Sequence, residues 1–110
     1  MMEEKIMVDM VIAEVKNLEV RKVEVVENTI KSKEEGKPDT TYRYIEVGFD
    51  DESGDRHTFK DKAVEEHADL YHRGDIGTLY LQIITEAVSK KDTTFVQDRT
   101  KVLIQDFKVN

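Results

Sequence analysis

The sequence contains no cysteine and no tryptophan, and Pro38 is its single proline. The absence of cysteine excludes disulfides, thiolate nucleophiles and thiolate metal sites. Positive charge is also scarce, because 17 Lys and Arg residues stand against 24 Asp and Glu residues, giving a formal net charge of −7. Binding to nucleic acid gains much of its affinity when Lys and Arg displace counterions from phosphates. The overall charge therefore opposes a polyanionic partner, while still allowing a local basic face.

Long apolar runs are absent as well. No window approaches the roughly 20 apolar residues of a membrane span, and the first residues do not form the apolar run of a signal peptide. We therefore expect no membrane segment and a cytoplasmic location by default, or an envelope location if a membrane anchor precedes the chain in the cell. The 110 residues are 38% hydrophobic and 37% charged, which suits one core under an ionised surface. The sequence predicts a single domain over residues 1–110.

Apolar residues recur at every second position in parts of the N-terminal half. From Ile6 to Ile12 every second residue is apolar, which predicts a strand with one buried face. The residues assigned to that face are Ile6, Val8, Met10 and Ile12. The pattern resumes over Leu18–Val25 with a shift of one residue, which predicts a bulge near Arg21 and Lys22. The polar stretch Lys31–Asp39 predicts a solvated loop.

A β-hairpin is expected next. Tyr42–Phe49 alternates, with Arg43, Ile45, Val47 and Phe49 on one face, and Asp50–Asp55 is a polar turn. His57 and Phe59 then mark a short return strand.

The chain after the hairpin predicts one helix and two or three strands. Asp61 is placed to cap a helix over Lys62–His72, which ends at Gly74. Leu79–Ile84 is apolar on both faces, which is typical of a central strand. A polar connection is expected over Ala87–Thr93. Phe95 and Val96 predict a brief strand, and the last strand is marked by Val102, Ile104, Phe107 and Val109.

The order of these elements is strand, strand, strand, helix, strand, strand. That order is typical of the OB-fold, a five-stranded Greek-key barrel with a helix after its third strand. We therefore predict an all-β chain with one short helix, folded as a small five- to six-stranded, OB-like Greek-key barrel.

The segment Tyr42–Leu81 carries a pattern of aromatic strand residues and glycine turns. Its parts are Tyr42, Tyr44 and Phe49 in one strand, Gly54 in the hairpin turn, Phe59, and the run Gly74-Asp75-Ile76-Gly77-Thr78-Leu79 that enters a strand. This pattern resembles a group of small bacterial β-barrel proteins of unknown function. Members of that group often carry an N-terminal membrane helix, which this sequence lacks. The resemblance implies a β-barrel and no particular activity.

Catalytic and metal-binding residues do not form a recognisable set. His57, His67 and His72, with Glu66 as a fourth candidate ligand, offer a weak zinc hypothesis, because His67 and His72 would point to different sides of a helix. The acidic hairpin turn lacks the glycine position of a calcium loop. The serines lie in polar loops outside any nucleophile-elbow sequence. We therefore predict no enzyme activity, no cofactor and no metal.

The glycine turn has two interpretations. Gly74, Asp75 and Gly77 resemble a phosphate-binding loop, but such loops usually precede a helix, and here a strand follows. We expect a structural turn in which the Asp75 side chain bonds to nearby backbone.

Two functions remain from different classes. The favoured one is a non-catalytic binding or scaffolding module that contacts a protein partner, or a second copy of itself, through a strand edge or a barrel face. The alternative is a single-stranded nucleic-acid-binding OB domain, which the charge disfavours. Its bases would stack on Tyr42, Tyr44, Phe59 and Tyr80, with Arg43, Lys60 and Lys62 as neighbouring cations.

Overall fold

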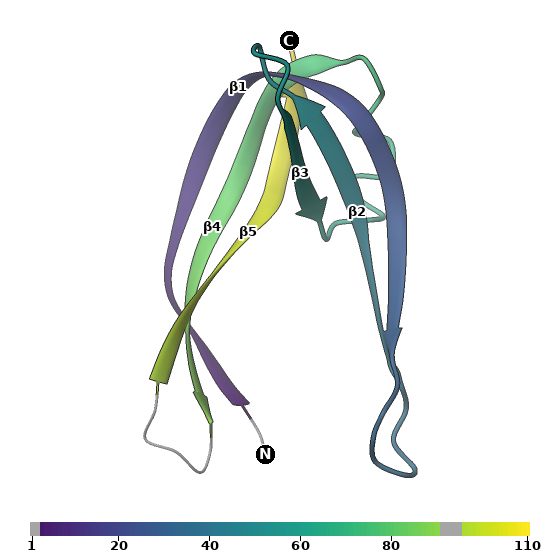
Figure 1. Cartoon of the computed structure of the whole chain (residues 1–110), viewed down its shortest axis with the longest axis vertical. Coiled ribbons are helices and arrows are strands. Elements are labelled where there is room, and N and C mark those ends of the chain that lie inside the picture. Colours follow the sequence, from purple (N-terminus) through teal and green to yellow (C-terminus); the bar gives the residue numbers. More distant parts are fainter. Residues whose placement is uncertain (1–2, 91–95) are drawn as a thin grey trace.

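The computed structural model describes residues 3–90 and 96–110, and it shows five strands in one antiparallel sheet. The strands are β1 (Glu3–Ile30), β2 (Thr40–Asp50), β3 (Arg56–Asp61), β4 (Ile76–Lys90) and β5 (Val96–Val109). Their order across the sheet is β3-β2-β1-β4-β5 (Figure 1). The all-β prediction and the number of strands are confirmed.

The long strand β1 has a different neighbour along each half. Its N-terminal half pairs with β4, and its C-terminal half, from Glu19 to Ile30, pairs with β2. The chain bends between these halves at Asn17, which has a φ of 60°, a left-handed conformation that asparagine tolerates better than most residues. The sheet therefore forms an arch with two arms (Figure 1).

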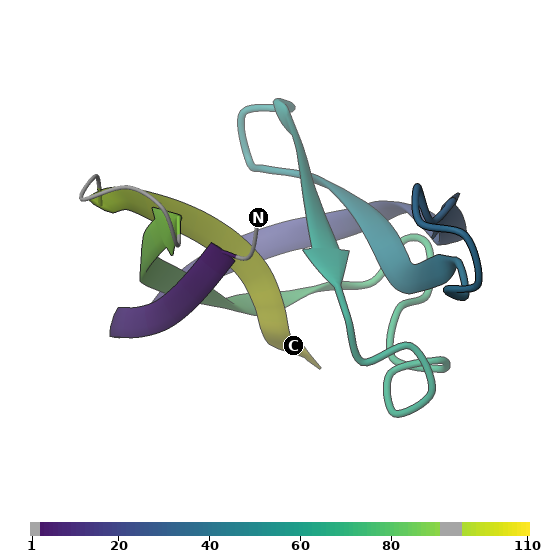
Figure 2. The same cartoon turned by 90° about the horizontal axis from the view of Figure 1, so that it is seen from below.

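We call these the β4 arm, made of residues 3–15 of β1 with β4 and β5, and the β2 arm, made of residues 19–30 of β1 with β2 and β3. Their free ends lie on opposite sides of the molecule in both views (Figures 1 and 2). We call the region where the arms meet the crest.

The hydrophobic core lies at the crest. Phe49 is fully buried, and its ring centroid lies 5.4 Å from that of Phe107 and 6.4 Å from those of Phe59 and Tyr71. The buried core residues are Leu18, Val20, Ile45, Val47, Phe49, Tyr71, Leu79, Leu81, Ile104 and Phe107. They come from both arms, so the core is the part of the molecule that joins them.

The structure does not show the closed barrel that the sequence predicts. The two edge strands, β3 and β5, approach each other beside the core. Within the described residues no strand pairing joins them, so the sheet is open there. The structure establishes one antiparallel five-stranded sheet, whereas the OB-like barrel stays a prediction from the order of elements along the chain.

The predicted helix over Lys62–His72 is wrong, because this segment is a series of turns. One helical bond joins the His67 amide to the Ala63 carbonyl at 2.9 Å, and the bonds that follow span only three residues. Short helices are marginal without tertiary support. Here side-chain bonds to Asp61, described below, hold the segment in another shape.

Several strand predictions are confirmed by the pairing. The β1–β2 register shifts between Val20 and Lys22, which is the predicted bulge. The hairpin forms with Phe49 opposite His57, and β4 is central because it pairs with β1 and β5. The last strand forms as β5 and contains Val102, Ile104, Phe107 and Val109, with a register shift against β4 between Tyr80 and Leu81.

Other predictions fail at the ends of the β4 arm. The face assigned to Ile6, Val8, Met10 and Ile12 is exposed rather than buried. A register shift between Met7 and Asp9 also interrupts its alternation. The polar connection expected over Ala87–Thr93 was placed too early in the chain, because β4 continues to Lys90. Residues 91–95, including Phe95, lie outside the described part of the chain.

Candidate binding surfaces

A buried carboxylate organises the segment between β3 and β4. Asp61 is fully buried and accepts hydrogen bonds from the Ala63 amide at 2.9 Å and the Tyr71 hydroxyl at 2.5 Å. Its Oδ2 also lies 2.6 Å from Nδ1 of His67. The bond to Ala63 is the local capping bond that the sequence predicts for Asp61, but no helix follows it.

This cluster is suited to hold the segment in place. Burial, followed by the hydrogen bond to Asp61, raises the pKa of the Tyr71 hydroxyl well above its ordinary value, so Tyr71 stays a neutral donor. The Asp61–His67 pair resembles the base and orienting acid of a triad, but neither residue lines the pocket described below. From the sequence, Asp61 was expected only as a helix cap. The sequence signal for this cluster was the presence of His67 and Tyr71, two side chains able to donate hydrogen bonds, shortly after Asp61.

The histidines are spread out. His57 Nε2 lies 2.9 Å from Oδ2 of Asp51 in the hairpin turn, His67 is bound to Asp61, and His72 is exposed. The hydrogen bond with His57, with further bonds from the Ser53 and Asp55 amides, lowers the pKa of Asp51. Among the residues whose side chains the structure describes, no three acidic or histidine side chains are grouped to hold a metal.

The glycine turn connects to the crest through its backbone. The Val20 carbonyl accepts a hydrogen bond from the Gly74 amide, and the Val20 amide donates one to the Asp75 carbonyl, both at 2.8 Å. No side-chain bond of Asp75 occurs among the hydrogen bonds of the described residues, in contrast to the expectation. Gly74 has a φ of +97°. A Cβ on Gly77 would lie 2.2 Å from the carbonyl oxygen of Lys108. The positive φ at Gly74 and the close backbone neighbour at Gly77 therefore both favour glycine over any residue with a Cβ.

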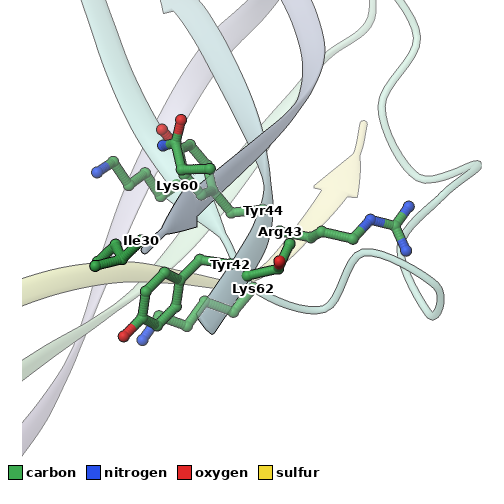
Figure 3. Close-up of a pocket in the computed structure, with 8 residues that line it drawn as sticks. Ile30, Tyr42, Arg43, Tyr44, Lys60 and Lys62 are labelled. Carbon is green, nitrogen blue, oxygen red and sulfur yellow. The ribbon is translucent and has the colours of Figure 1, made fainter. Parts of the chain in front are cut away.

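A pocket of about 670 Å³ lies on the β2 arm (Figure 3). Its lining residues are Asn28, Ile30, Thr41, Tyr42, Arg43, Tyr44, Lys60 and Lys62. Tyr42 and Tyr44 share a face of β2 because side chains alternate along a strand. Tyr42 is 52% exposed, and Lys60 Nζ lies 4.7 Å from the centre of the Tyr44 ring. This is a local cation–π contact in an acidic chain.

Two of the four aromatic candidates lie elsewhere. Phe59 points into the crest, where its ring lies 6.4 Å from that of Phe49. Tyr80 is on β4, opposite Glu14 and Asp106, with Lys108 Nζ 5.3 Å from its ring centre. The structure thus brings together Tyr42, Tyr44, Lys60 and Lys62, but it separates them from Phe59 and Tyr80. Arg43 lines the pocket as well, but its guanidinium lies 3.9 Å from Glu27.

The second surface is the apolar β4 arm, whose residues Ile6, Val8, Met10 and Ile12 were expected to be buried. Ile6, Met7 and Val8 are 65%, 62% and 62% exposed. Four further apolar residues of β1 are also exposed, namely Met10, Val11, Ile12 and Val15. The register places Val11 and Val15 on the face that continues into the core, and Met10 and Ile12 on the opposite face. Both faces of this strand therefore expose apolar side chains.

The same strand has a free edge. Residues 3–15 of β1 pair with β4 on one side, and no strand of the described chain pairs with them on the other. Unpaired strand edges expose a row of backbone donors and acceptors that can bind another strand. The free edge and the exposed apolar residues coincide over the β4 arm.

Comparisons with known proteins give no further assignment. No family model matches the chain, and neither the curated proteins nor the solved structures gave a significant match. The resemblance to small bacterial β-barrel proteins therefore stays a prediction. Among the described residues no helix is long and apolar enough to cross a membrane.

Proposed function

We propose that this protein is a non-catalytic binding module whose β4 arm pairs with another polypeptide, and that this polypeptide is a second copy of the chain. The observation that supports it is the coincidence of seven exposed large apolar residues on β1, from Ile6 to Val15, with an edge that no described strand occupies.

Burial supplies the driving force for this pairing. Apolar surface removed from water contributes about 25 cal/mol per Å², and soluble monomers rarely leave large contiguous apolar patches exposed. An added strand would satisfy the edge groups of β1 through main-chain hydrogen bonds. A second copy brings a strand with the same apolar residues, and two-fold pairing of identical chains is the commonest form of assembly.

Charge gives the association a recognisable salt dependence. Each copy carries a formal net charge of −7, so two copies repel each other over long range at low ionic strength. Salt screens this repulsion within about 10 Å at 0.1 M. Self-association should therefore strengthen as salt rises, which is the opposite of binding to a polyanion.

Sedimentation or light scattering over a series of protein and salt concentrations tests the proposal. The wild-type chain is expected to associate, and Met10→Lys or Ile12→Lys is expected to be monomeric and folded. Val25→Lys is the matched control, because Val25 is an exposed apolar residue of the same strand on the β2 arm. A wild-type chain that stays monomeric up to about 1 mM would contradict the proposal, because a dissociation constant of that size corresponds to a binding free energy of only about −4 kcal/mol.

A further inference from the structure

We propose that the pocket on the β2 arm binds single-stranded nucleic acid, with bases on Tyr42 and Tyr44 and phosphates on Lys60 and Lys62. The pocket lies on the opposite arm from the free β1 edge, so this binding does not depend on self-association. It also revises the set of stacking residues expected from the sequence, since Phe59 and Tyr80 take no part.

The pocket offers aromatic surface that the fold does not use. Its exposed lining is mainly apolar, and Tyr42 is about half exposed. Asn28 lies opposite Tyr42 in the β1–β2 register, so an amide side chain stands beside the ring. An exposed aromatic face stacks any base, and an amide can bond the edge of one.

The cations beside these rings are available for phosphate. No carboxylate of the described residues forms an ion pair with Lys60 or Lys62, although the chain has an excess of acids. The nearest acid in the register, Glu46 opposite Lys60, is held by Lys22 Nζ at 3.3 Å. Figure 3 shows Lys60 and Lys62 on the same side of β2 as Tyr42, whereas Arg43 extends to the other side.

None of the described residues that line the pocket carries a carboxylate. Of the eight described residues that line it, Lys60 and Lys62 supply its positive charge. Arg43 is turned to the other side of β2, where it lies 3.9 Å from a carboxylate oxygen of Glu27. The pocket therefore has the opposite sign to the chain as a whole. This charge complementarity, together with the stacking surface, selects an anion that carries flat aromatic rings. Bases must be unstacked to reach such a ring, which favours a single strand over a duplex.

The affinity for an oligonucleotide should depend only weakly on salt, because few phosphates are contacted. With Lys60 and Lys62 each neutralising one phosphate, log K should fall against log salt with a slope of about −1.4, at about 0.7 per contact for single strands. The acidic remainder of the chain repels the strand, so binding is best measured at low salt.

Fluorescence anisotropy with labelled single-stranded DNA and RNA oligonucleotides tests this proposal. Tyr42→Ala is expected to weaken binding by about five- to 150-fold, the range for loss of one stacking platform. Lys60→Ala and Lys62→Ala should each flatten the salt slope by about 0.7. All three side chains belong to exposed residues, so the variants should keep the wild-type melting temperature. Binding of DNA, RNA or both supports the site and shows which sugar it accepts.

The β4 arm supplies matched controls. Tyr80 and Lys108 form the same kind of ring and ammonium pair, at 5.3 Å, away from the pocket. Tyr80→Ala and Lys108→Ala should leave affinity and salt slope unchanged in protein that remains folded.

Three results would overturn the proposal. The first is no binding of either oligonucleotide at low salt and high micromolar protein. The second is equal binding by wild type and the folded Tyr42→Ala, Lys60→Ala and Lys62→Ala variants. The third is equal competition by duplex DNA or polyglutamate, since these supply charge without accessible bases.

Discussion

The crest and the β4 arm are built from the same strand and the same kind of sequence, yet they differ in what covers them. Leu18 and Val20 of β1 are 1% and 0% exposed, whereas Ile6 and Val8 of that strand are 65% and 62% exposed. At the crest both arms contribute side chains to one core. On the β4 arm, by contrast, the seven large apolar residues of β1 from Ile6 to Val15 stay exposed. Apolar alternation therefore predicts a strand, but it does not tell whether this chain or another one covers the strand.

The largest expected difference between the two regions is in stability. Phe49→Ala removes a fully buried ring at the crest and should lower the free energy of unfolding by about 3 to 5 kcal/mol. Ile12→Ala on the β4 arm should change it far less in dilute, monomeric protein. Urea midpoints of the two variants measure this contrast. Equal losses would show that the arm is as well covered as the crest.

The glycine turn should respond next. Gly77→Ala places a methyl group 2.2 Å from a backbone oxygen, and overpacking of this kind costs about 1 to 3 kcal/mol or more. Gly74→Ala introduces a Cβ at a φ of +97°, which costs about 1 to 2 kcal/mol. Denaturation should show both losses, with the larger for Gly77. Normal midpoints with lost self-association or oligonucleotide binding would instead make the turn a binding site.

A smaller and pH-dependent effect is expected at Tyr71. Its raised pKa in the folded state means that the unfolded chain loses the Tyr71 proton first, near the ordinary tyrosine pKa of about 10. The contribution of Tyr71 to stability is thus complete below pH 10 and declines above it, by up to about 1.4 kcal/mol per pH unit. Tyr71→Phe should lose about 1 kcal/mol at neutral pH with its hydrogen bond, and this deficit should shrink above pH 10. A deficit independent of pH would contradict the assignment.

The sequence predicts most of the sheet because its signals are local. Alternation over Tyr42–Phe49 and a polar turn are sufficient for a hairpin, and the phase shift after Val20 was enough to predict the bulge at Arg21. The all-β class and the five strands followed from the succession of alternating segments and polar turns. These features depend on residues close together in the chain.

The failures involve tertiary contacts. Lys62–His72 has helical spacing, but Asp61 binds His67 and Tyr71 and turns the segment against the crest. Burial of Ile6–Ile12 would require another part of the structure to pack against this strand, and the local sequence pattern carries no information about such packing. The pocket was found in part, since Tyr42, Tyr44, Lys60 and Lys62 were named. Phe59 was wrongly grouped with them, because its inward direction follows from the core it packs against.

Hydrogen exchange of the β1 amides tests the central claim most directly. Amides of residues 9–15 that face the free edge should exchange quickly in dilute protein and become protected as protein concentration and salt rise. Amides at the crest, including those of Phe49 and Leu79, should keep the same protection throughout. Protection of the β1 edge that does not change with concentration would contradict the claim that a second copy covers the β4 arm.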